Sequence, residues 1–148
     1  MNKNIVVVAV IVILILIVGG IYLLAGSPGG LIGGSKSFNI QGMKVEIVKN
    51  GTGEGAKVGD NILVNYVGTL TDGKKFDSSF DRNQPFPYTL GQNRVIKGWE
   101  LGLVGMKVGE QRKLTIPPEL GYGAQGAGAV IPPNSTLIFV IDMVSINK

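Results

Sequence analysis

Apolar and polar residues alternate along several stretches of the chain after residue 42. Met43, Val45 and Ile47 alternate with the charged Lys44 and Glu46. Successive side chains of an extended strand point to opposite faces, so this period of two predicts a strand with one buried face. The same alternation predicts further strands at three places: residues 61–66, 111–116 and 136–146.

Two dipeptides that contain glycine predict tight turns next to these strands. They are Asn50-Gly51 and Asp72-Gly73. The second position of such a turn needs a positive φ, which glycine adopts without steric cost. We therefore expect a positive φ at both glycines.

One segment carries apolar residues at helical spacing instead. Ile96, Trp99 and Leu103 recur at intervals of three and four residues after Asn93, a candidate N-cap. Two glycines inside this segment lower its helicity by about 1 kcal/mol each relative to alanine, so packing must stabilise the helix. A mostly antiparallel sheet with one short helix on its concave face gives an α+β fold.

The N-terminal part of the chain has neither of these periods. From Ile5 to Leu24, 20 consecutive residues carry no charge, and a helix of that length spans about 30 Å, the hydrocarbon thickness of a bilayer. We predict a short flank at residues 1–4 and a transmembrane signal anchor, a single N-terminal helix, at residues 5–25. A cleaved signal peptide is the alternative, because Lys3 precedes the run and small residues follow it, although signal peptides usually have an apolar region of about 7 to 15 residues.

The orientation of such an anchor depends on the basic residues around it. Lys3 and the amino terminus precede the run, and Lys36 and Lys44 follow it, so the two sides are nearly balanced. We predict a single-pass membrane protein with its N-terminus in the cytoplasm and its domain outside; signal cleavage would instead give a secreted protein. Residues 26–42 are rich in Gly and Ser and predict a flexible linker to a domain at residues 43–148.

Composition narrows the chemistry that the domain can perform. The 148 residues include no histidine and no cysteine, which excludes histidine-assisted nucleophiles, imidazole or thiolate metal sites and disulfides. The carboxylates are dispersed without the spacing of a calcium loop, so we expect no metal and no cofactor. The net charge of +4 is spread without a basic run, and nucleic acid is therefore not an expected partner.

Aromatic residues are concentrated in one part of the chain. Eight of the ten lie between residues 66 and 139: Tyr66, Phe76, Phe80, Phe86, Tyr88, Trp99, Tyr122 and Phe139. For any one of them the simplest interpretation is core packing. However, Phe76, Phe80 and Phe86 lie in a stretch with loop character, where the backbone is expected near the surface. Taken alone, Asp77 and Arg82 in that stretch indicate only a surface ion pair.

Four motifs follow one another through the predicted domain. They are GKKFDSSFDRNQPF at 73–86, VIKGWE at 95–100, LGYGA at 120–124 and VIPPNSTLIF at 130–139. Over residues 43–146 the sequence resembles the FKBP-type peptidyl-prolyl cis-trans isomerases, which carry these motifs in this order. The resemblance implies a curved antiparallel β-sheet wrapped around one short α-helix, with an apolar pocket between them. It also implies isomerisation of X-Pro bonds in support of protein folding.

The resemblance further implies which residues form the pocket. The expected catalytic residues are Tyr66, Phe76, Asp77, Trp99, Tyr122 and Phe139, and the expected substrate-binding residues are Arg82, Phe86, Val95, Ile96 and Ile131. Trp99 would form the pocket floor, and the Tyr122 hydroxyl and the Ile96 N–H would donate hydrogen bonds to a ligand carbonyl. Asp77 would border the pocket, held by neighbours such as Tyr66 and Arg82.

Two features depart from the family pattern. The flap beside the pocket has small residues at 126–129, and Arg94 occupies a rim position that is acidic in some relatives. Both could change which sequences flank the preferred proline. The expected partners are proline-containing polypeptides and macrolide inhibitors, and we expect a monomer. The alternative function is a peptide-binding or chaperone module that uses the same groove without catalysis, since a fold does not fix a function.

Overall fold

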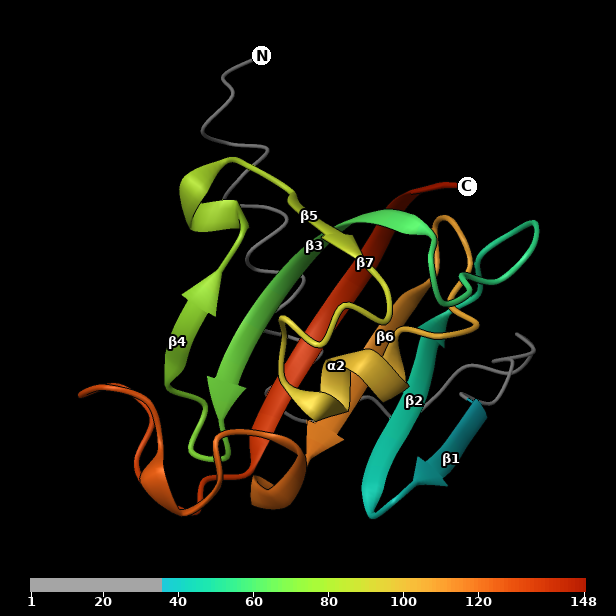
Figure 1. Ribbon diagram of the computed structural model, residues 1–148. Helices are drawn as coiled ribbons and strands as arrows, with labels where there is room; N and C mark the ends of the chain where they lie inside the picture. The colour runs from blue at the N-terminus through green and yellow to red at the C-terminus, as the bar shows by residue number, and fades with distance from the viewer. Residues whose placement is uncertain (1–35) are drawn as a thin grey trace, which may run out of the picture. The chain divides into compact units, whose positions relative to one another are not determined.

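The computed structural model describes residues 36–148. They form a seven-stranded sheet, in which every strand pair is antiparallel, and a single α-helix, α2 (Lys97–Gly102), which crosses one face of the sheet (Figure 1). The strands are β1 (Lys36–Ile40), β2 (Met43–Lys49), β3 (Asn61–Leu70), β4 (Lys75–Ser78), β5 (Phe86–Thr89), β6 (Gln111–Ile116) and β7 (Leu137–Asn147). Their order is β1-β2-β6-β7-β3-β4, and β5 also pairs with β3. The α+β fold with one short helix is confirmed for this part of the chain.

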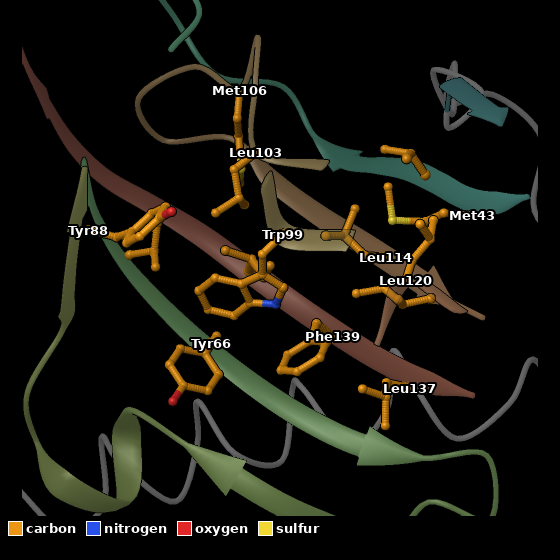
Figure 2. Packing of buried hydrophobic residues seen from close by; sticks show 14 of the residues in the cluster. Met43, Tyr66, Tyr88, Trp99, Leu103, Met106, Leu114, Leu120, Leu137 and Phe139 are labelled. Carbon is orange, nitrogen blue, oxygen red and sulfur yellow. The ribbon is translucent and has the colours of Figure 1, made fainter. Parts of the chain in front are cut away.

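The predicted alternation buries one face of the central strands. In β3, Ile62, Val64 and Tyr66 are buried, whereas the residues between them remain partly exposed. The inward side chains of β6 and β7 complete this face, and it is covered by Trp99 of α2 and by Leu103, which follows the helix (Figure 2). The core therefore lies between the helix and the sheet.

The two glycines of α2 explain how so short a helix is held. A Cβ atom at Gly98 would lie 2.6 Å from Ile116 Cγ2, and one at Gly102 would lie 2.6 Å from Leu114 Cδ1. Larger residues would push the helix away from β6. The glycines thus reduce the intrinsic helicity of α2 but allow it to pack closely against the sheet. This packing stabilises the helix.

The prediction of a flexible linker up to residue 42 is wrong at its C-terminal end. Residues Lys36–Ile40 form β1 and pair with β2 through a turn in which Gln41 and Gly42 have φ values of 49° and 85°. Most side chains of β1 are exposed, so the strand depends on backbone pairing and carries no alternating pattern. The folded domain includes residue 36 instead of starting at residue 43.

The turn predicted at Asn50-Gly51 is also wrong. Gly51 lacks a positive φ, whereas Gly53 has a φ of 80° and Gly73, as predicted, a φ of 86°. A Cβ at position 51 would lie 2.6 Å from the carbonyl oxygen of Val108, so glycine is needed there for a close backbone approach. Position 51 lies near the start of a long connection between β2 and β3, and no tight hairpin forms there.

Two local assignments in the middle of the chain need correction. The N-cap of α2 is Ile96, not Asn93; Asn93 has a φ of 53° and its N–H donates to Glu100 Oε1 over 2.7 Å. The stretch with loop character contains two short strands, β4 and β5, which carry Phe76 and Phe86. Phe80 lies between them in a 3₁₀ turn, Phe80–Arg82. These strands are short, and their pairing with β3 is what defines them.

The predicted N-terminal flank, transmembrane anchor and most of the linker fall outside the described residues. Within residues 36–148, no helix combines the length and the hydrophobicity that a membrane crossing requires.

Candidate active site

A cavity of about 390 Å³ opens between α2, the neighbouring strands and the loops that follow β6. Ten of the eleven residues expected at the pocket line it: Tyr66, Phe76, Asp77, Phe86, Val95, Ile96, Trp99, Tyr122, Ile131 and Phe139. The eleventh, Arg82, does not line it. Three further residues that were not among the predicted site residues, Arg94, Ala127 and Val130, complete the lining.

Trp99 lies at the centre of the aromatic lining. Its ring centroid is 5.0 Å from that of Tyr66, 5.3 Å from Phe139 and 5.9 Å from Phe86, each in an edge-to-face arrangement. Figure 2 shows the indole next to both Tyr66 and Phe139. Phe76 extends the wall by an edge contact with Phe139 at 5.4 Å. Edge-to-face packing fixes these rings, so the cavity has a rigid apolar base.

Helix α2 places this indole. Trp99 lies in the first turn and is only 4% exposed. Because Gly98 allows the helix backbone to approach β6 closely, the indole reaches the sheet side chains of β3 and β7. Gly98 thus explains how the Trp99 indole reaches the place expected for the pocket floor.

A hydrogen-bonded triangle forms the polar edge of the cavity. The Tyr66 hydroxyl donates to Asp77 Oδ2 over 2.5 Å, Arg82 donates to Asp77 Oδ1 over 2.5 Å, and Arg82 also donates to the Tyr66 hydroxyl over 2.8 Å. Arg82 therefore meets the lining through Asp77 and Tyr66, each of which accepts a hydrogen bond from its guanidinium. The contact with Asp77 is the one that the resemblance implied, and a contact of Arg82 with substrate stays a prediction.

This triangle keeps the carboxylate ionised and the phenol neutral. Burial acts to raise the pKa of Asp77, but hydrogen bonds from Tyr66 and Arg82 outweigh it, and the pKa falls below the usual 3.8. Burial, followed by the hydrogen bond to Asp77, raises the pKa of Tyr66 to about 12. The guanidinium balances the one carboxylate of the lining, so the triangle carries no net charge.

Several hydrogen-bond donors at the cavity have no protein acceptor within residues 36–148, and two of them are the donors that the resemblance implied for a ligand carbonyl. One is the Tyr122 hydroxyl, on a side chain that is 42% exposed. The other is the N–H of Ile96, whose own carbonyl accepts from Trp99 and Glu100 at the start of α2. Both are available to a carbonyl group of a ligand, as the sequence resemblance implied.

Glu100 is a positioning residue that the sequence analysis did not single out. It is buried in α2 and accepts hydrogen bonds from the Tyr88 hydroxyl, from the Gly91 N–H at 2.9 Å and from the Asn93 N–H at 2.7 Å. These bonds tie the loop that carries the cavity residues Val95 and Ile96 to the helix. A glutamate on a helix ordinarily indicates an exposed position, so only its place within the VIKGWE motif could have marked it.

The flap beside the cavity is closed by its own backbone. Ala127 and Ile131 exchange N–H···O=C hydrogen bonds of 2.9 and 3.1 Å. Gly126 has a φ of 65°, and a Cβ there would lie 2.3 Å from the Ile131 carbonyl oxygen. This close turn places Ile131, which is 4% exposed, against the cavity.

Comparison with known proteins identifies the family. Residues 52–144 match the sequence model described as FKBP-type peptidyl-prolyl cis-trans isomerase. FK506-binding protein 1A of Neurospora crassa is 52% identical over 108 residues, which cover 72% of this chain and 90% of the relative. The chain belongs to the FKBP-type peptidyl-prolyl cis-trans isomerases.

A bacterial relative and a solved structure agree with this assignment. The FK506-binding protein of Neisseria meningitidis serogroup B is 53% identical to this FKBP over 105 residues, 71% of this chain and 96% of the relative. The crystal structure of FkpA from Escherichia coli superimposes with a TM-score of 0.69 at 43% identity. That match covers 79% of this chain but 53% of FkpA, so this FKBP spans about half the length of that protein. The isomerase function expected from the motifs is confirmed: the enzyme acts on X-Pro peptide bonds.

Proposed function

We propose that this FKBP accelerates X-Pro rotation by removing water from the planar bond and binding its twisted form. An X-Pro bond prefers trans by only about 0.5 to 1 kcal/mol, but it exchanges over tens to hundreds of seconds because rotation breaks amide resonance. The barrier is about 18 to 20 kcal/mol. Resonance gives the planar bond a large dipole, which water stabilises and which twisting reduces. An apolar cavity therefore disfavours the planar ground state more than the twisted transition state.

The arrangement around Trp99 carries this proposal. Three rings pack edge-to-face around the indole, and the free donors of Ile96 and Tyr122 are available to hold the carbonyls of a bound segment. No step moves a proton or forms a covalent bond. Asp77 is engaged by two donors with its pKa lowered, so it serves to fix Tyr66 and not as an acid.

The required stabilisation is within reach of such a site. Shortening the exchange from about 100 s to about 1 ms is a factor of about 10⁵, or roughly 7 kcal/mol at 1.36 kcal/mol per decade. Burial of the proline ring, loss of water and hydrogen bonds to the twisted conformer share this amount. Each of them acts without a nucleophile or a cofactor.

Exchange NMR on a short peptide with an apolar residue before proline tests the proposal. We expect the full chain to accelerate exchange between the cis and trans signals, and Trp99→Ala to abolish most of the acceleration. The alternative of a non-catalytic binding module predicts shifted peptide signals in the presence of the protein, with the exchange rate of the peptide alone. That result would contradict the proposed mechanism.

We also propose that the cavity takes macrolide inhibitors. Relatives from Neurospora crassa and Neisseria meningitidis are named as FK506-binding proteins, and the same apolar cavity and free donors support this ligand class here. FK506 should inhibit catalysed exchange competitively and alter Trp99 fluorescence. Inhibition that leaves Trp99 fluorescence unchanged would place the macrolide elsewhere.

The cellular setting is a separate proposal that rests on residues 1–25. We propose a single-pass anchor with the N-terminus in the cytoplasm and the enzyme outside, where it assists the folding of proteins at or beyond the membrane. The support is the uncharged run of 20 residues from Ile5 to Leu24. Protease added to cells whose cytoplasmic membrane is intact, but whose outer envelope has been made permeable, should digest the isomerase domain. Mass spectrometry of the mature chain separates this from the alternative of a secreted, signal-cleaved protein.

We propose further that the enzyme is a monomer. The cavity is lined from within one chain, by elements from β3 to β7, so catalysis does not need a second copy. Light scattering of the detergent-solubilised chain, corrected for bound detergent, should give the mass of one copy per particle. This mass should hold over the whole range of protein concentrations in which activity per chain is constant.

A further inference from the structure

A second cavity adjoins the proline pocket along strand β5. Its volume is about 450 Å³, and residues of β5, the start of β3 and the loop before α2 line it. Two side chains, Phe86 and Arg94, line both cavities. A polypeptide whose proline fills the first cavity can therefore continue into the second only by passing these two side chains.

Arg94 is the charged residue of the two cavity linings that has no partner of opposite charge within residues 36–148. The other charged residue in either lining is Asp77, and Arg82 neutralises it at 2.5 Å. Arg94 is exposed, and within residues 36–148 it makes no ion pair. Its guanidinium donates only a long hydrogen bond of 3.4 Å to Gln92 Oε1. Most of its donors are thus left for a ligand.

The nearest carboxylate along the chain does not compensate Arg94. Glu100 is 9% exposed and is occupied by the Tyr88 hydroxyl and by the N–H groups of Gly91 and Asn93. The second cavity itself offers neutral polar groups, among them Asn61 and Thr89, which are hydrogen-bonded to each other at 2.6 Å. An acidic side chain entering this cavity would meet a guanidinium and no carboxylate of the lining.

We propose that Arg94 makes this enzyme select segments that carry a carboxylate within about three residues of the isomerised proline. The proposal rests on the isomerase function and adds a sequence preference to it. An extended chain advances about 3.3 to 3.6 Å per residue, so two or three residues suffice to pass from one adjoining cavity into the next. The planar guanidinium matches a carboxylate with two parallel hydrogen bonds, which a lysine does not provide.

A matched peptide series tests the proposal. Each peptide contains Leu-Pro and differs only in one residue, Glu, Gln or Lys, placed two residues before the proline in one set and two after it in the other. Exchange NMR with the full chain in detergent gives kcat/KM for each peptide. We expect the Glu peptide of at least one set to exceed its Gln partner by about two- to five-fold, the range of exposed ion pairs, mainly through KM. The set that shows the preference also gives the direction of the bound chain.

Three variants assign the preference to one side chain. Arg94→Gln should equalise the Glu and Gln peptides, and Arg94→Glu should favour the Lys peptide. Lys113→Gln removes the same charge from β6 at a position that alternates with the buried Leu114, facing away from the cavities, and should retain the preference. Salt at about 0.5 M should weaken the preference of the wild-type enzyme, because it screens exposed charges.

Two results would overturn the proposal. One is equal kcat/KM for Glu and Gln peptides in both sets; the other is a preference that survives in Arg94→Gln. These results are distinct from a failure of the enzyme function, in which no peptide of either set would exchange faster than without protein. A midpoint of urea unfolding equal to that of wild type shows that Arg94→Gln is folded.

Discussion

The hydroxyl of Tyr66 on β3 lies 2.5 Å from the carboxylate of Asp77 on the neighbouring strand β4. This bond joins the apolar and polar parts of the site, because the Tyr66 ring packs against Trp99 while its hydroxyl holds Asp77. Arg82 closes the arrangement by donating to both. The aromatic base of the cavity and its charged edge are therefore positioned by a single side chain.

The first prediction concerns the Tyr122 hydroxyl. It has no protein hydrogen-bond partner within the described residues and is available to a ligand. We expect Tyr122→Phe to lower kcat/KM about two- to ten-fold, the equivalent of one hydrogen bond of about 0.5 to 1.5 kcal/mol. Urea unfolding should give a free energy of unfolding within about 0.5 kcal/mol of wild type. A large loss of stability would mean that the hydroxyl has a structural partner.

The second prediction concerns the base of the cavity. Trp99→Ala removes the ring that contacts Tyr66, Phe86 and Phe139. Unfolding in urea should show a loss of about 3 to 5 kcal/mol, and exchange NMR should show a much larger loss of activity than in Tyr122→Phe. Trp99→Phe is the control, since it retains an aromatic ring and should recover part of both quantities. Equal effects of Trp99→Ala and Tyr122→Phe on activity would contradict the assignment of the indole as pocket floor.

The third prediction concerns pH. Of the cavity residues, the pKa of Asp77 lies below its usual 3.8, that of Tyr66 is raised to about 12, and that of Tyr122 is raised above 10 by burial and then by the charge of Asp77. None of them therefore changes charge between about pH 5 and about pH 9. With an uncharged peptide, kcat/KM should be constant over about this range. A bell-shaped profile would indicate an acid or base that the site does not contain.

The same shifts predict how stability responds to acid. Because the pKa of Asp77 is lower in the folded than in the unfolded state, the folded state gains stability above the unfolded value, near 3.8. That contribution is lost as pH falls through the lower, folded pKa. Asp77→Asn should therefore flatten the decline of the free energy of unfolding at acidic pH. An unchanged acid limb in Asp77→Asn would show that other carboxylates account for it.

The fourth prediction concerns the packing of α2. Alanine is the better helix former by about 1 kcal/mol, but a Cβ at Gly98 would lie 2.6 Å from Ile116 Cγ2. We expect Gly98→Ala to destabilise the protein by about 1 to 3 kcal/mol, as overpacking does. Gly102→Ala should cost less, because its Cβ would meet the terminal Cδ1 of Leu114, which has more freedom to move. Stabilisation by Gly98→Ala in urea unfolding would show that the helix has room to shift.

Much of the cavity could be anticipated from motifs, whereas the inward carboxylate of Glu100 and the place of Arg82 outside the lining could not. Trp99, Tyr122 and Ile131 lie at the cavity as the four motifs implied. Arg82 was expected to touch substrate, yet it reaches only Asp77 and Tyr66. A long side chain has many rotamers, and the one it adopts depends on which partners the fold brings within reach. Glu100 was passed over for the same reason, since nothing local indicates that its carboxylate turns inward.

Local patterns in the chain were sufficient for the central strands, the helix and the absence of histidine or thiol chemistry. The strands and the helix depend on residues a few positions apart, where strand or helix geometry sets the spacing of the buried side chains. The excluded chemistry follows from composition alone. The edge strand β1, the close approach at Gly51 and the unpaired Arg94 could be seen only in the folded chain. Each depends on contacts between segments distant in sequence, and it is the pairing of strands that brings those segments together.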